Sequence, residues 1–380
     1  MNSSCSCNCG QTLQILMYTS NTNHSHTGGS HAQENQLKPK AVALISGGLD
    51  SMLAAKVVLD QGVHVEGINF YTGFCVESHT SSIRAREGLI RRNNALWVAE
   101  QLGIKLHIID IAEEYKEIVL NPKHGYGQHL NPCLDCKIFM IARAQEWAIG
   151  RGYDFIVTGE VMGQRPKSQR KQAMPLIARE SGVADRLLRP LCAKHMPESL
   201  PEREGWVDRS KLHGFHGRNR KPQIELARAY GFEDWAQPAG GCCFLTNEHY
   251  SAKLADLWAA RGERDYSLDD IVLLKVGRHL RPAPHWKMII SREDGENFYL
   301  EGYRRLGPFL RTLSHGGPVA LLDGTPTRTD VDVAARTLAR YGQGRSAQEV
   351  SVQVEYPDGR GEVRVVAPYH EMEIPKGWHI

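Results

Sequence analysis

The chain has 380 residues, a hydrophobic content of 41% and a formal net charge of +3, with a mean hydropathy of −0.40. This length allows two or three domains with cores of their own. The sequence has neither an apolar run approaching the roughly 20 residues that span a bilayer nor the basic-then-apolar start of a secretion signal, so we expect a cytoplasmic protein without a membrane segment. Because the net charge is small, affinity for nucleic acid would have to come from local basic patches.

Residues 1–38 are rich in Ser, Asn, His, Thr and Gly and lack apolar periodicity, which predicts a disordered leader. The leader carries side chains of the metal-ligating types, namely Cys5, Cys7, Cys9, His24, His26 and His31. We expect these to be incidental, as such residues usually are in a flexible tail. The chain as a whole has 9 cysteines, and without a secretion signal they indicate thiol or metal chemistry rather than a disulfide framework.

From Lys40 onward, strand and helix patterns alternate along the chain. The patterns predict strands at residues 41–45, 63–70, 105–111 and 155–159, and helices at residues 52–59, 94–102 and 138–149. This alternation is typical of an α/β fold, a doubly wound and mostly parallel sheet, which we assign to a catalytic domain at residues 39–247. Ligands of such sheets bind beyond the carboxyl ends of the strands, so residues 46–51 and 158–160 should lie on the same rim.

The pattern changes after about residue 246. A helical pattern at residues 249–261 leads into alternating segments at residues 287–290, 297–300, 349–356 and 362–367. These segments predict a second, smaller α+β or β-rich domain at residues 248–380. We find no internal repeat in the sequence.

The most informative segment follows the first predicted strand and reads Ser46-Gly47-Gly48-Leu49-Asp50-Ser51. A strand, a glycine turn and a helix start together form an anion site, because backbone N–H groups can approach a phosphate and the helix start adds its dipole. The Asp50 carboxylate fits beside a bound anion if Mg²⁺ bridges the two. The segment is neither the mononucleotide P-loop nor G-x-G-x-x-G. The alternative is an ordinary strand–turn–helix with a small-residue N-cap.

A second segment, residues 131–137, carries Cys133 and Cys136 where a helix begins. A thiol at a helix N-terminus is a more reactive nucleophile and a better metal ligand. One C-x-x-C supplies a redox pair, half of a zinc site or two thirds of a three-cysteine iron–sulfur site. The alternative is a pair of small buried residues.

A third segment, residues 239–246, contains two glycines followed by Cys242 and Cys243. Either cysteine could be a third metal ligand or a sulfur carrier, and the alternative is a tight turn with two buried cysteines. Cys192 is expected in the core. Cys75 follows a strand on the ligand-binding rim, where it is as easily a small buried residue as a site residue.

Two basic segments complete the candidate functional residues. Residues 158–171 pass from a strand through a glycine turn into basic residues, which suits the phosphates of ATP or RNA. Residues 209–221 interleave basic residues with glycines and an aromatic, which suits a sugar–phosphate backbone. Solvated charged loops are the alternative for both. The candidate RNA-binding side chains are Arg165, Lys167, Arg170, Lys171, Arg218 and Arg220.

These motifs resemble those of known families. Residues 46–51 resemble the pyrophosphate loop of ATP pyrophosphatases, and together with Thr158-Gly159-Glu160-x-x-Gly163-Gln164 they resemble the catalytic domain of tRNA 4-thiouridine synthetases. Asn131-Pro132-x-x-x-Cys136 resembles the cysteine loop of tRNA-specific 2-thiouridylases. Residues 276–279 and 291–297 resemble an RNA-binding module shared with ribosome quality-control proteins. The resemblance covers roughly residues 40–300.

The resemblance implies that the protein cleaves ATP between the α- and β-phosphates, with Mg²⁺ near Asp50, and adenylates a carbonyl oxygen. The ATP-binding residues that it implies are Ser46, Gly47, Gly48, Asp50, Ser51, Thr158, Gly159 and Gln164. The chain departs from the families in two ways. We expect no N-terminal RNA-binding domain of the 4-thiouridine type, and Cys133 is an added cysteine. That cysteine is similar to those of iron–sulfur-dependent thiolases, in which Cys133, Cys136 and Cys242 would hold a [4Fe–4S] cluster.

The sequence therefore predicts ATP-dependent thiolation of a tRNA uridine, with tRNA and a sulfur donor as partners. The donor would be a cysteine desulfurase or sulfide, and the sulfur would reside on the cluster or on a cysteine persulfide. The alternatives are a ligase or amidotransferase of the same nucleotide-binding class acting on a small metabolite, and an RNA-binding protein that retains the nucleotide fold without catalysis. The sequence leaves open the modified nucleotide, the thiolated carbon and the oligomeric state.

Overall fold

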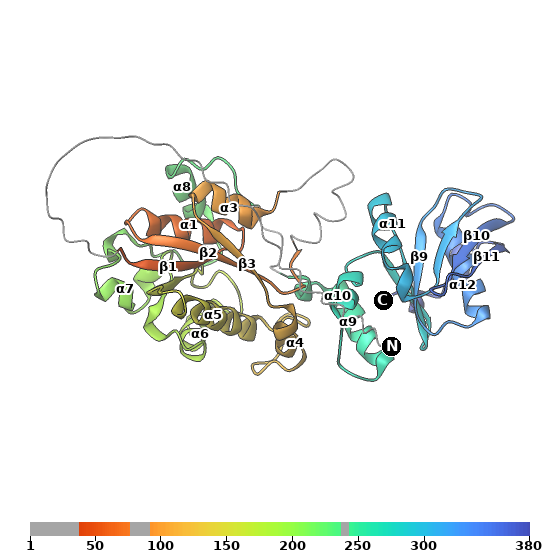
Figure 1. Ribbon diagram of the computed structural model, residues 1–380, viewed down its shortest axis with the longest axis horizontal. Coiled ribbons are helices and arrows are strands. Elements are labelled where there is room, and N and C mark those ends of the chain that lie inside the picture. Colours follow the sequence, from red (N-terminus) through yellow and green to blue (C-terminus); the bar gives the residue numbers. More distant parts are fainter. Residues whose placement is uncertain (1–37, 77–91, 237–242) are drawn as a thin grey trace, which may run out of the picture. The chain divides into compact units, whose positions relative to one another are not determined.

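The computed structural model describes residues 38–76, 92–236 and 243–380 (Figure 1). Most of the predicted leader and its cysteines and histidines lie outside these ranges, as do Gly240, Gly241 and Cys242. Among the described helices, none has both the length and the apolar character needed to cross a membrane.

The first part of the described chain forms a five-stranded sheet in the order β3-β2-β1-β4-β5, with every adjacent pair parallel. Its strands are β1 (Lys40–Leu44), β2 (His64–Tyr71), β3 (Leu106–Asp110), β4 (Phe155–Val157) and β5 (Leu187–Leu188). The central strand is apolar because helices cover both of its faces. The chain order reverses beside β1, and such a switch point is where ligands bind in open α/β sheets.

Helices cover both faces of the parallel sheet (Figure 1). One face carries α1 (Leu49–Leu59), α3 (Asn94–Leu102) and α8 (Lys221–Ala229), whose apolar side chains share one core with β1. The other face carries α5 (Cys133–Ile149) and α6 (Ala173–Glu180). The remaining helices of this part are α4 (Ala112–Leu120) and the short α7 (Leu200–Arg203). The predicted doubly wound α/β fold is confirmed.

The rest of the described chain forms an antiparallel six-stranded sheet in the order β11-β10-β8-β9-β7-β6. Its strands are β6 (Arg278–Ala283), β7 (Trp286–Ile290), β8 (Phe309–Thr312), β9 (Val319–Gly324), β10 (Val350–Glu355) and β11 (Gly361–Val366). The helices are α9 (Glu248–Arg261), α10 (Leu268–Leu273), α11 (Asp294–Glu301) and α12 (Arg328–Tyr341). The apolar side of α12 packs on this sheet, which confirms the predicted α+β character.

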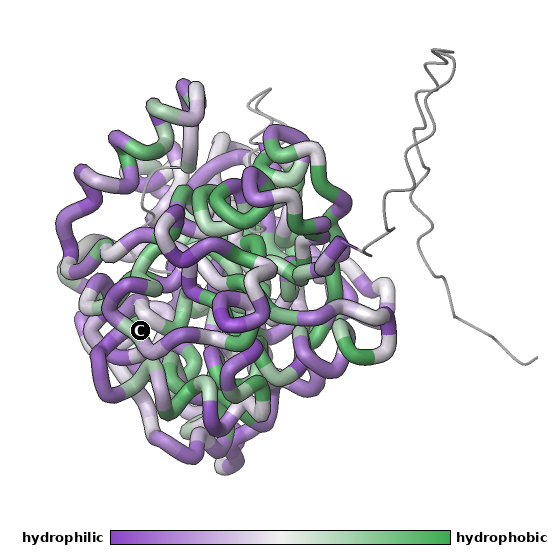
Figure 2. Tube along the Cα trace, turned by 90° about the vertical axis from the view of Figure 1, so that its left-hand side faces the viewer, coloured by the Kyte–Doolittle hydropathy of each residue, from purple (hydrophilic) through white to green (hydrophobic). Residues whose placement is uncertain are grey.

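Single 3₁₀ turns occur at Ala184–Arg186, Ala193–His195, Arg209–Lys211, Phe244–Thr246, Arg304–Leu306, Glu371–Glu373 and Lys376–Trp378. The outer turns of the chain trace are mostly hydrophilic, whereas its hydrophobic stretches concentrate inside (Figure 2). The proposed boundary between the two domains at residues 247 and 248 stays a prediction.

One predicted strand is wrong. Residues 297–300 belong to helix α11. Alternation along a strand would put Phe298 and Leu300 on the same face, yet Phe298 is 51% exposed and Leu300 is fully buried. The helix is favoured because Glu296 in its first turn accepts hydrogen bonds from the backbone N–H groups of Gly277 and Arg292. A four-residue pattern is too short to distinguish the two structures.

Candidate active site at the carboxyl ends of the parallel strands

The predicted strand, glycine turn and helix start are present at residues 40–59. Gly47 has a backbone φ of +81°, and a Cβ atom there would lie 2.8 Å from the backbone nitrogen of Ala95 in α3, so only glycine fits. The Ser51 hydroxyl donates a hydrogen bond of 2.8 Å to the carbonyl oxygen of Gly48. Because Gly48 is the N-cap of α1 and has no side chain, the first amides of α1 begin without a side-chain cap.

Asp50, in the first turn of α1, is held by one of its two carboxylate oxygens. Its Oδ2 accepts a hydrogen bond of 2.7 Å from Nε2 of Gln164, and Oε1 of Gln164 accepts one of 3.0 Å from Gln223. Its Oδ1 is buried and has no hydrogen-bond partner among the described residues. Burial raises the pKa of Asp50, although Gln164 and the charges of Arg220 and Arg165 partly oppose this. The arrangement leaves one fixed carboxylate oxygen for a cation.

The motif after β4 packs directly against this helix start. A Cβ atom on Gly159 would lie 2.5 Å from backbone atoms of Asp50, so the two predicted motifs do share one rim. Thr158 donates a hydrogen bond of 3.1 Å to Glu160, and Nε of Arg189 donates one of 2.8 Å to the same carboxylate oxygen. Burial is the largest influence on Glu160 and raises its pKa, but the charges of Arg189 and Lys137 and the hydrogen bonds from Arg189 and Thr158 together outweigh burial, so the net pKa is lowered. Glu160 and Arg189 therefore form a buried ion pair, to which Thr158 adds a hydrogen bond.

The two basic segments meet beside Asp50. The backbone N–H of Gly217 donates a hydrogen bond of 2.7 Å to the carbonyl of Met162, and Met162 forms a parallel bridge with His216. The predicted RNA-binding side chains are exposed except for Arg220, which is partly buried. None of them forms an ion pair with a carboxylate of the described residues. Since the charge of Arg220 acts on Asp50, this residue lies at the phosphate loop as well as in a basic segment.

Helix α5 begins at Cys133, five residues earlier than predicted, so both cysteines of the C-x-x-C lie in its first turn. The Cys133 thiol lies 3.4 Å from the Ser168 hydroxyl, and Sγ of Cys136 lies 3.9 Å from Sδ of Met140. Among the described residues, no three His, Cys, Asp or Glu side chains are grouped so that they could hold a metal ion. Because Cys242 lies outside the described ranges, the three-cysteine cluster stays a prediction.

The structure brings other cysteines to the same rim. Sγ of Cys243 lies 3.9 Å from Oδ1 of Asn131, just before α5, and Cys243 forms an antiparallel bridge with Cys75, just after β2. Cys192 is fully buried, its thiol lies 3.2 Å from the backbone oxygen of Glu160, and burial raises the pKa of Cys192 to about 11. Cys192 is therefore a core residue, as expected.

Sequence reasoning missed several residues of this rim. Gln223 is fully buried behind Gln164, and Asn69 donates a hydrogen bond of 2.7 Å to the carbonyl of Ile45 at the end of β1. Lys275 is buried close to Gly73. Asn69 and Lys275 each interrupt an apolar run, and these interruptions could have identified both residues from the sequence. Gln223 follows Lys221 and Pro222 at a helix start, where nothing distinguishes it from an exposed glutamine.

The C-terminal sheet carries an open groove of about 630 Å³ lined by Arg278, Ser291, Arg292, Glu293, Asp294, Asn297, Gly316, Gly317, Pro318, Tyr341, Gly342, Gln343 and Arg345. This groove is bordered by two segments singled out from the sequence, residues 276–279 and 291–297. Glu296 connects these two segments through hydrogen bonds. Its carboxylate accepts hydrogen bonds from the N–H of Gly277 at 3.1 Å and of Arg292 at 2.7 Å. The groove therefore presents three arginines, Arg278, Arg292 and Arg345, beside two carboxylates, Glu293 and Asp294.

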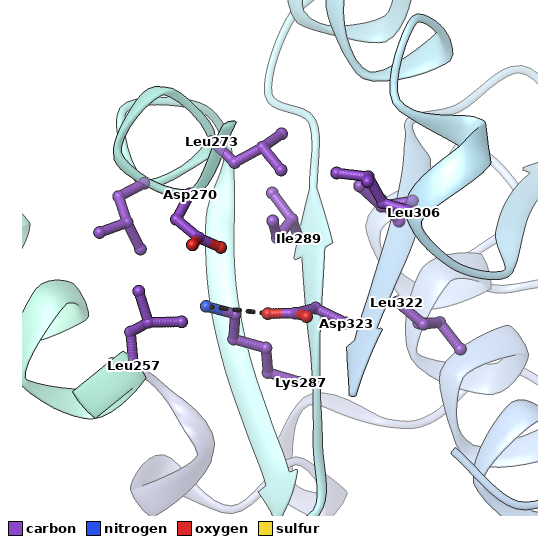
Figure 3. A pocket seen from close by; sticks show the side chains of 10 residues that line it. Leu257, Asp270, Leu273, Lys287, Ile289, Leu306, Leu322 and Asp323 are labelled. Carbon is purple, nitrogen blue, oxygen red and sulfur yellow. Dashed lines mark ion pairs between the residues drawn. The ribbon is translucent and has the colours of Figure 1, made fainter. Parts of the chain in front are cut away.

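A second cavity in this part, between α10 and strands β7 and β9, measures only about 30 Å³ (Figure 3). It contains the ion pair of the buried Lys287 and the partly exposed Asp323, with Nζ and Oδ2 3.3 Å apart (Figure 3). That volume is about the room of one water molecule, so this cavity is not a ligand site.

Comparison with known proteins gives two family matches. Residues 37–197 match the family described as Thiamine biosynthesis protein (ThiI), and residues 277–379 match the NFACT protein RNA binding domain. The chain is 31% identical over 257 residues to the tRNA-specific 2-thiouridylase MnmA of Pseudomonas putida, covering 66% of this chain and 63% of the relative. It is 30% identical over 124 residues to that of Acidothermus cellulolyticus, covering 32% of this chain and 34% of the relative.

The chain thus spans between one third and just under two thirds of these curated relatives. A crystal structure of a 4-thiouridine synthetase–RNA complex with bound ATP matches with 23% identity and a TM-score of 0.37, over 55% of this chain and 46% of that chain. The chain combines a ThiI-like domain with an NFACT-type RNA-binding domain and is a distant homologue of the tRNA-specific 2-thiouridylases.

Proposed function

We propose that this protein is an ATP-dependent tRNA sulfurtransferase. A uridine carbonyl oxygen attacks the α-phosphorus of ATP, pyrophosphate leaves, and sulfur then displaces AMP from the activated carbon. Adenylation is needed because a carbonyl oxygen is a very poor leaving group, whereas AMP is a good one. The ThiI-like match and the homology to tRNA-specific 2-thiouridylases support this reaction class. ATP and tRNA as substrates are consistent with a cytoplasmic location.

The observation that carries the proposal is the arrangement around Asp50. Gln164 fixes Oδ2, so Oδ1 stays oriented without a protein partner among the described residues. The first backbone N–H groups of α1, which have no side-chain cap, would bind the phosphates, and Arg220 and Arg165 add positive charge where pyrophosphate would leave. Asp50 would hold Mg²⁺, which, when bound, neutralises charge on the phosphates. Gly159 packs against the helix start, and we keep Thr158 and Gly159 as proposed ATP-binding residues.

Two sulfur sources follow from the sequence, a [4Fe–4S] cluster on Cys133, Cys136 and Cys242 or a persulfide on one cysteine. The described thiols support the persulfide, since Cys243 lies beside Asn131 and opposite Cys75. The donor would be a cysteine desulfurase or sulfide. Anaerobic purification with iron and sulfide analysis separates the sources: bound iron with absorbance near 400 nm would overturn the persulfide version.

The tRNA would contact the exposed basic side chains that form no described ion pair, Arg165, Lys167, Arg170, Lys171 and Arg218. The groove lined by Arg278, Arg292 and Arg345, together with Glu293 and Asp294, offers a second candidate RNA surface within the region that matches the NFACT RNA-binding domain. Phosphate contacts of this kind make affinity fall steeply with salt. Steep salt dependence of tRNA binding would therefore separate this function from that of a small-metabolite ligase.

The test compares Asp50→Ala with Asp60→Ala, which changes the carboxylate at the opposite end of α1. Asp60 pairs with Lys56 on the surface and is remote from the loop. We expect Asp50→Ala to lower tRNA-dependent pyrophosphate release by about 100–1,000-fold, because one preorganised electrostatic group is worth about 2.7–4 kcal/mol, while tRNA affinity stays within about twofold. An Asp50→Ala protein with normal pyrophosphate release would overturn the assignment.

The product is identified by mass spectrometry of tRNA nucleosides from cells that lack the protein. We expect one thionucleoside to disappear, which also identifies the nucleotide and the carbon. A thiolation profile unchanged from wild type would contradict tRNA thiolation and favour a small-metabolite substrate.

A further inference from the structure

The two outer edges of the antiparallel six-stranded sheet differ. The edge at β6 is covered by the C-terminal tail, because Leu280 forms an antiparallel bridge with His379 and the N–H of Ile380 donates a hydrogen bond of 3.2 Å to the carbonyl of His279. The edge at β11 (Gly361–Val366) has β10 on one side and, in the described part of the chain, no strand or bridge on the other. Such an edge is a template for pairing with another chain.

The hairpin of β10 and β11 determines which backbone groups face this open edge. The N–H of Tyr356 donates a hydrogen bond of 2.8 Å to the carbonyl of Arg360, so these residues form a hydrogen-bonded pair. Because the two pair types alternate along an antiparallel ladder, the even-numbered residues of β11 bond to β10. The N–H and C=O groups of Gly361, Val363 and Val365 therefore point away from the sheet, and no backbone group of the described residues pairs with them.

The side chains of β11 separate into an apolar face and a charged face. Val363 and Val365 are 57% and 59% exposed. Glu362 and Arg364 lie on the other face, because the residues opposite them in β10 belong to the core under α12. Nη1 of Arg364 lies 2.8 Å from Oδ1 of Asp332 in α12, and its Nη2 lies 2.8 Å from Oε1 of Glu362. The strand thus has exposed valines on one face and a charge pair on the other.

We propose that β11 pairs with β11 of a second copy of this chain, antiparallel and about a two-fold axis through Val363. Val363 then stands opposite Val363 of the second copy, and Gly361 stands opposite Val365. All of these residues direct their N–H and C=O groups outward, so every one of these pairs forms two hydrogen bonds. The contact uses the same surface on both copies and closes at two chains. It goes beyond the proposed function and does not rest on it.

The charges of β11 select this register. With the axis at Val363, Glu362 of one copy lies opposite Arg364 of the other in a non-hydrogen-bonded pair, the type in which side chains approach most closely. The hydrogen bonds that Glu362 accepts within the chain, from Tyr356 and Arg364, both end on Oε1, which leaves Oε2 for the second copy. Moving the axis by one residue would oppose Glu362 to Glu362 or Arg364 to Arg364, and like charges destabilise such pairs.

The apolar face favours a second copy over RNA as the occupant. Across the axis the two Val363 side chains are neighbours and the Val365 side chains lie on the diagonals, within contact distance for branched side chains. The cation of the strand, Arg364, is already paired with Asp332 and Glu362, so the edge offers phosphates little charge. The open groove is lined by no residue of β11, and pairing therefore leaves this candidate RNA surface accessible.

The first experiment measures the oligomeric state of the full-length protein by sedimentation over a wide range of concentrations. We expect a dimer of twice 42.6 kDa. Val363→Pro removes an N–H that makes no bond within the sheet, so it should raise the dissociation constant at least about tenfold, because both hydrogen bonds at the axis are lost. Val363→Thr keeps the N–H and should dimerise as wild type. A monomer at every concentration, or an unchanged dissociation constant in Val363→Pro, would overturn the proposal.

The second experiment tests the register by exchanging charges. Glu362→Arg and Arg364→Glu each place like charges opposite one another, so each variant should be monomeric at concentrations where the wild type is a dimer. An equimolar mixture of the two should form a heterodimer, because opposite charges then face each other at both positions. Glu349→Arg, an exposed residue before β10 with the same change of charge, is the matched control and should dimerise. Single variants that dimerise as wild type, or a mixture that stays monomeric, would refute this register.

The third experiment detects the contact at the axis directly. The Cα atoms of a hydrogen-bonded pair are about 5.5 Å apart, which lies within the range of about 4.4–6.8 Å over which a disulfide closes. Val363→Cys protein should therefore form a covalent dimer under mild oxidation, with peptides linked through position 363 by mass spectrometry. Val365→Cys is the matched control, because position 365 faces Gly361 and not its own copy. Linkage through position 365 as fast as through position 363 would contradict an axis at Val363.

Discussion

The phosphate loop around Asp50 and the outer edge of β11 differ in how their polar groups are satisfied. In the loop, Gln164 fixes Asp50 from within the chain, next to the buried ion pair of Glu160 and Arg189. At β11, the outward N–H and C=O groups pair with no backbone group of the described residues. A loop with oriented polar groups suits activation at phosphates, whereas an unpaired edge suits association with a second chain.

The comparison predicts that the two regions respond to different substitutions. Changes under or within the phosphate loop should reduce pyrophosphate release and leave the pairing of two chains unchanged. Changes at β11 should do the opposite. The expected effects below run from the largest to the smallest.

Arg189→Met should give the largest loss of stability. It leaves Glu160 as a buried carboxylate without its cation, and breaking a buried pair costs about 3–5 kcal/mol. The exposed pair of Arg203 and Asp185 supplies the control, because Arg203→Met should cost at most about 1 kcal/mol. The measurement is the free energy of unfolding in urea. Equal losses for the two variants would refute the role given to the buried pair.

The same pair predicts a pH dependence. Because the pKa of Glu160 is lowered in the folded protein, its contribution to stability is present above the unfolded carboxyl pKa and is lost as pH falls through the lower folded value. The double variant Glu160→Gln/Arg189→Met should lack this acid-side loss and should be more stable than Arg189→Met alone. Urea titrations at several acidic pH values measure both effects. Other carboxyls with lowered pKa, such as Asp270 and Glu296, contribute the rest of the acid-side slope, so a double variant whose slope equals that of the wild type would contradict this account.

Gly159→Ala should strongly reduce activation. The added Cβ would lie 2.5 Å from backbone atoms of Asp50, so the first turn of α1 has to shift, and overpacking of this kind costs about 1–3 kcal/mol. Pyrophosphate release should fall by about 100-fold or more, because the donors of the loop lose their alignment. At Gly150 an added Cβ would meet nothing within 4 Å, so Gly150→Ala should match wild type. Normal activity of Gly159→Ala would show that the loop tolerates displacement.

The same contrast explains what the sequence could predict. The phosphate loop is one contiguous segment after an apolar strand, so residues 46–51 carry its whole signature, and local patterns also located β1, β2, α1 and α3. The alternation at residues 362–367 predicts a strand, but only the folded sheet shows that β11 is the outermost one. The cysteines of the rim are likewise brought together only by the folded chain. No local pattern couples Cys75 to Cys243, and the buried ammonium of Lys275 is apparent only as an interruption of an apolar run.

Gln164→Leu should have a smaller effect with a specific pH signature. The hydrogen bond from Gln164 lowers the pKa of Asp50 against the rise that burial causes, so its removal raises that pKa further. If activation needs the ionised carboxylate, the acidic limb of the pyrophosphate-release profile should move to higher pH, and the rate at neutral pH should fall about 10–100-fold. The exposed Gln172→Leu, in the same loop, should leave the profile unchanged. An unmoved acidic limb would mean that Gln164 only packs against the loop.

The smallest expected effect concerns the exposed cations. Arg218 and Lys171 form no ion pair with a described carboxylate and are exposed, so each is available to a phosphate. Arg218→Ser and Lys171→Ser should each lower the slope of log affinity against log salt for tRNA by about 0.7–0.9, the contribution of one phosphate contact. Lys105→Ser, at the amino end of β3 and therefore on the opposite edge of the sheet, should leave the slope unchanged. Because neither cation belongs to β11, two chains should pair as in wild type in both variants. An equal loss of slope in Lys105→Ser would mean that tRNA senses the overall charge of the protein and not the rim on which activation and sulfur transfer are proposed to meet.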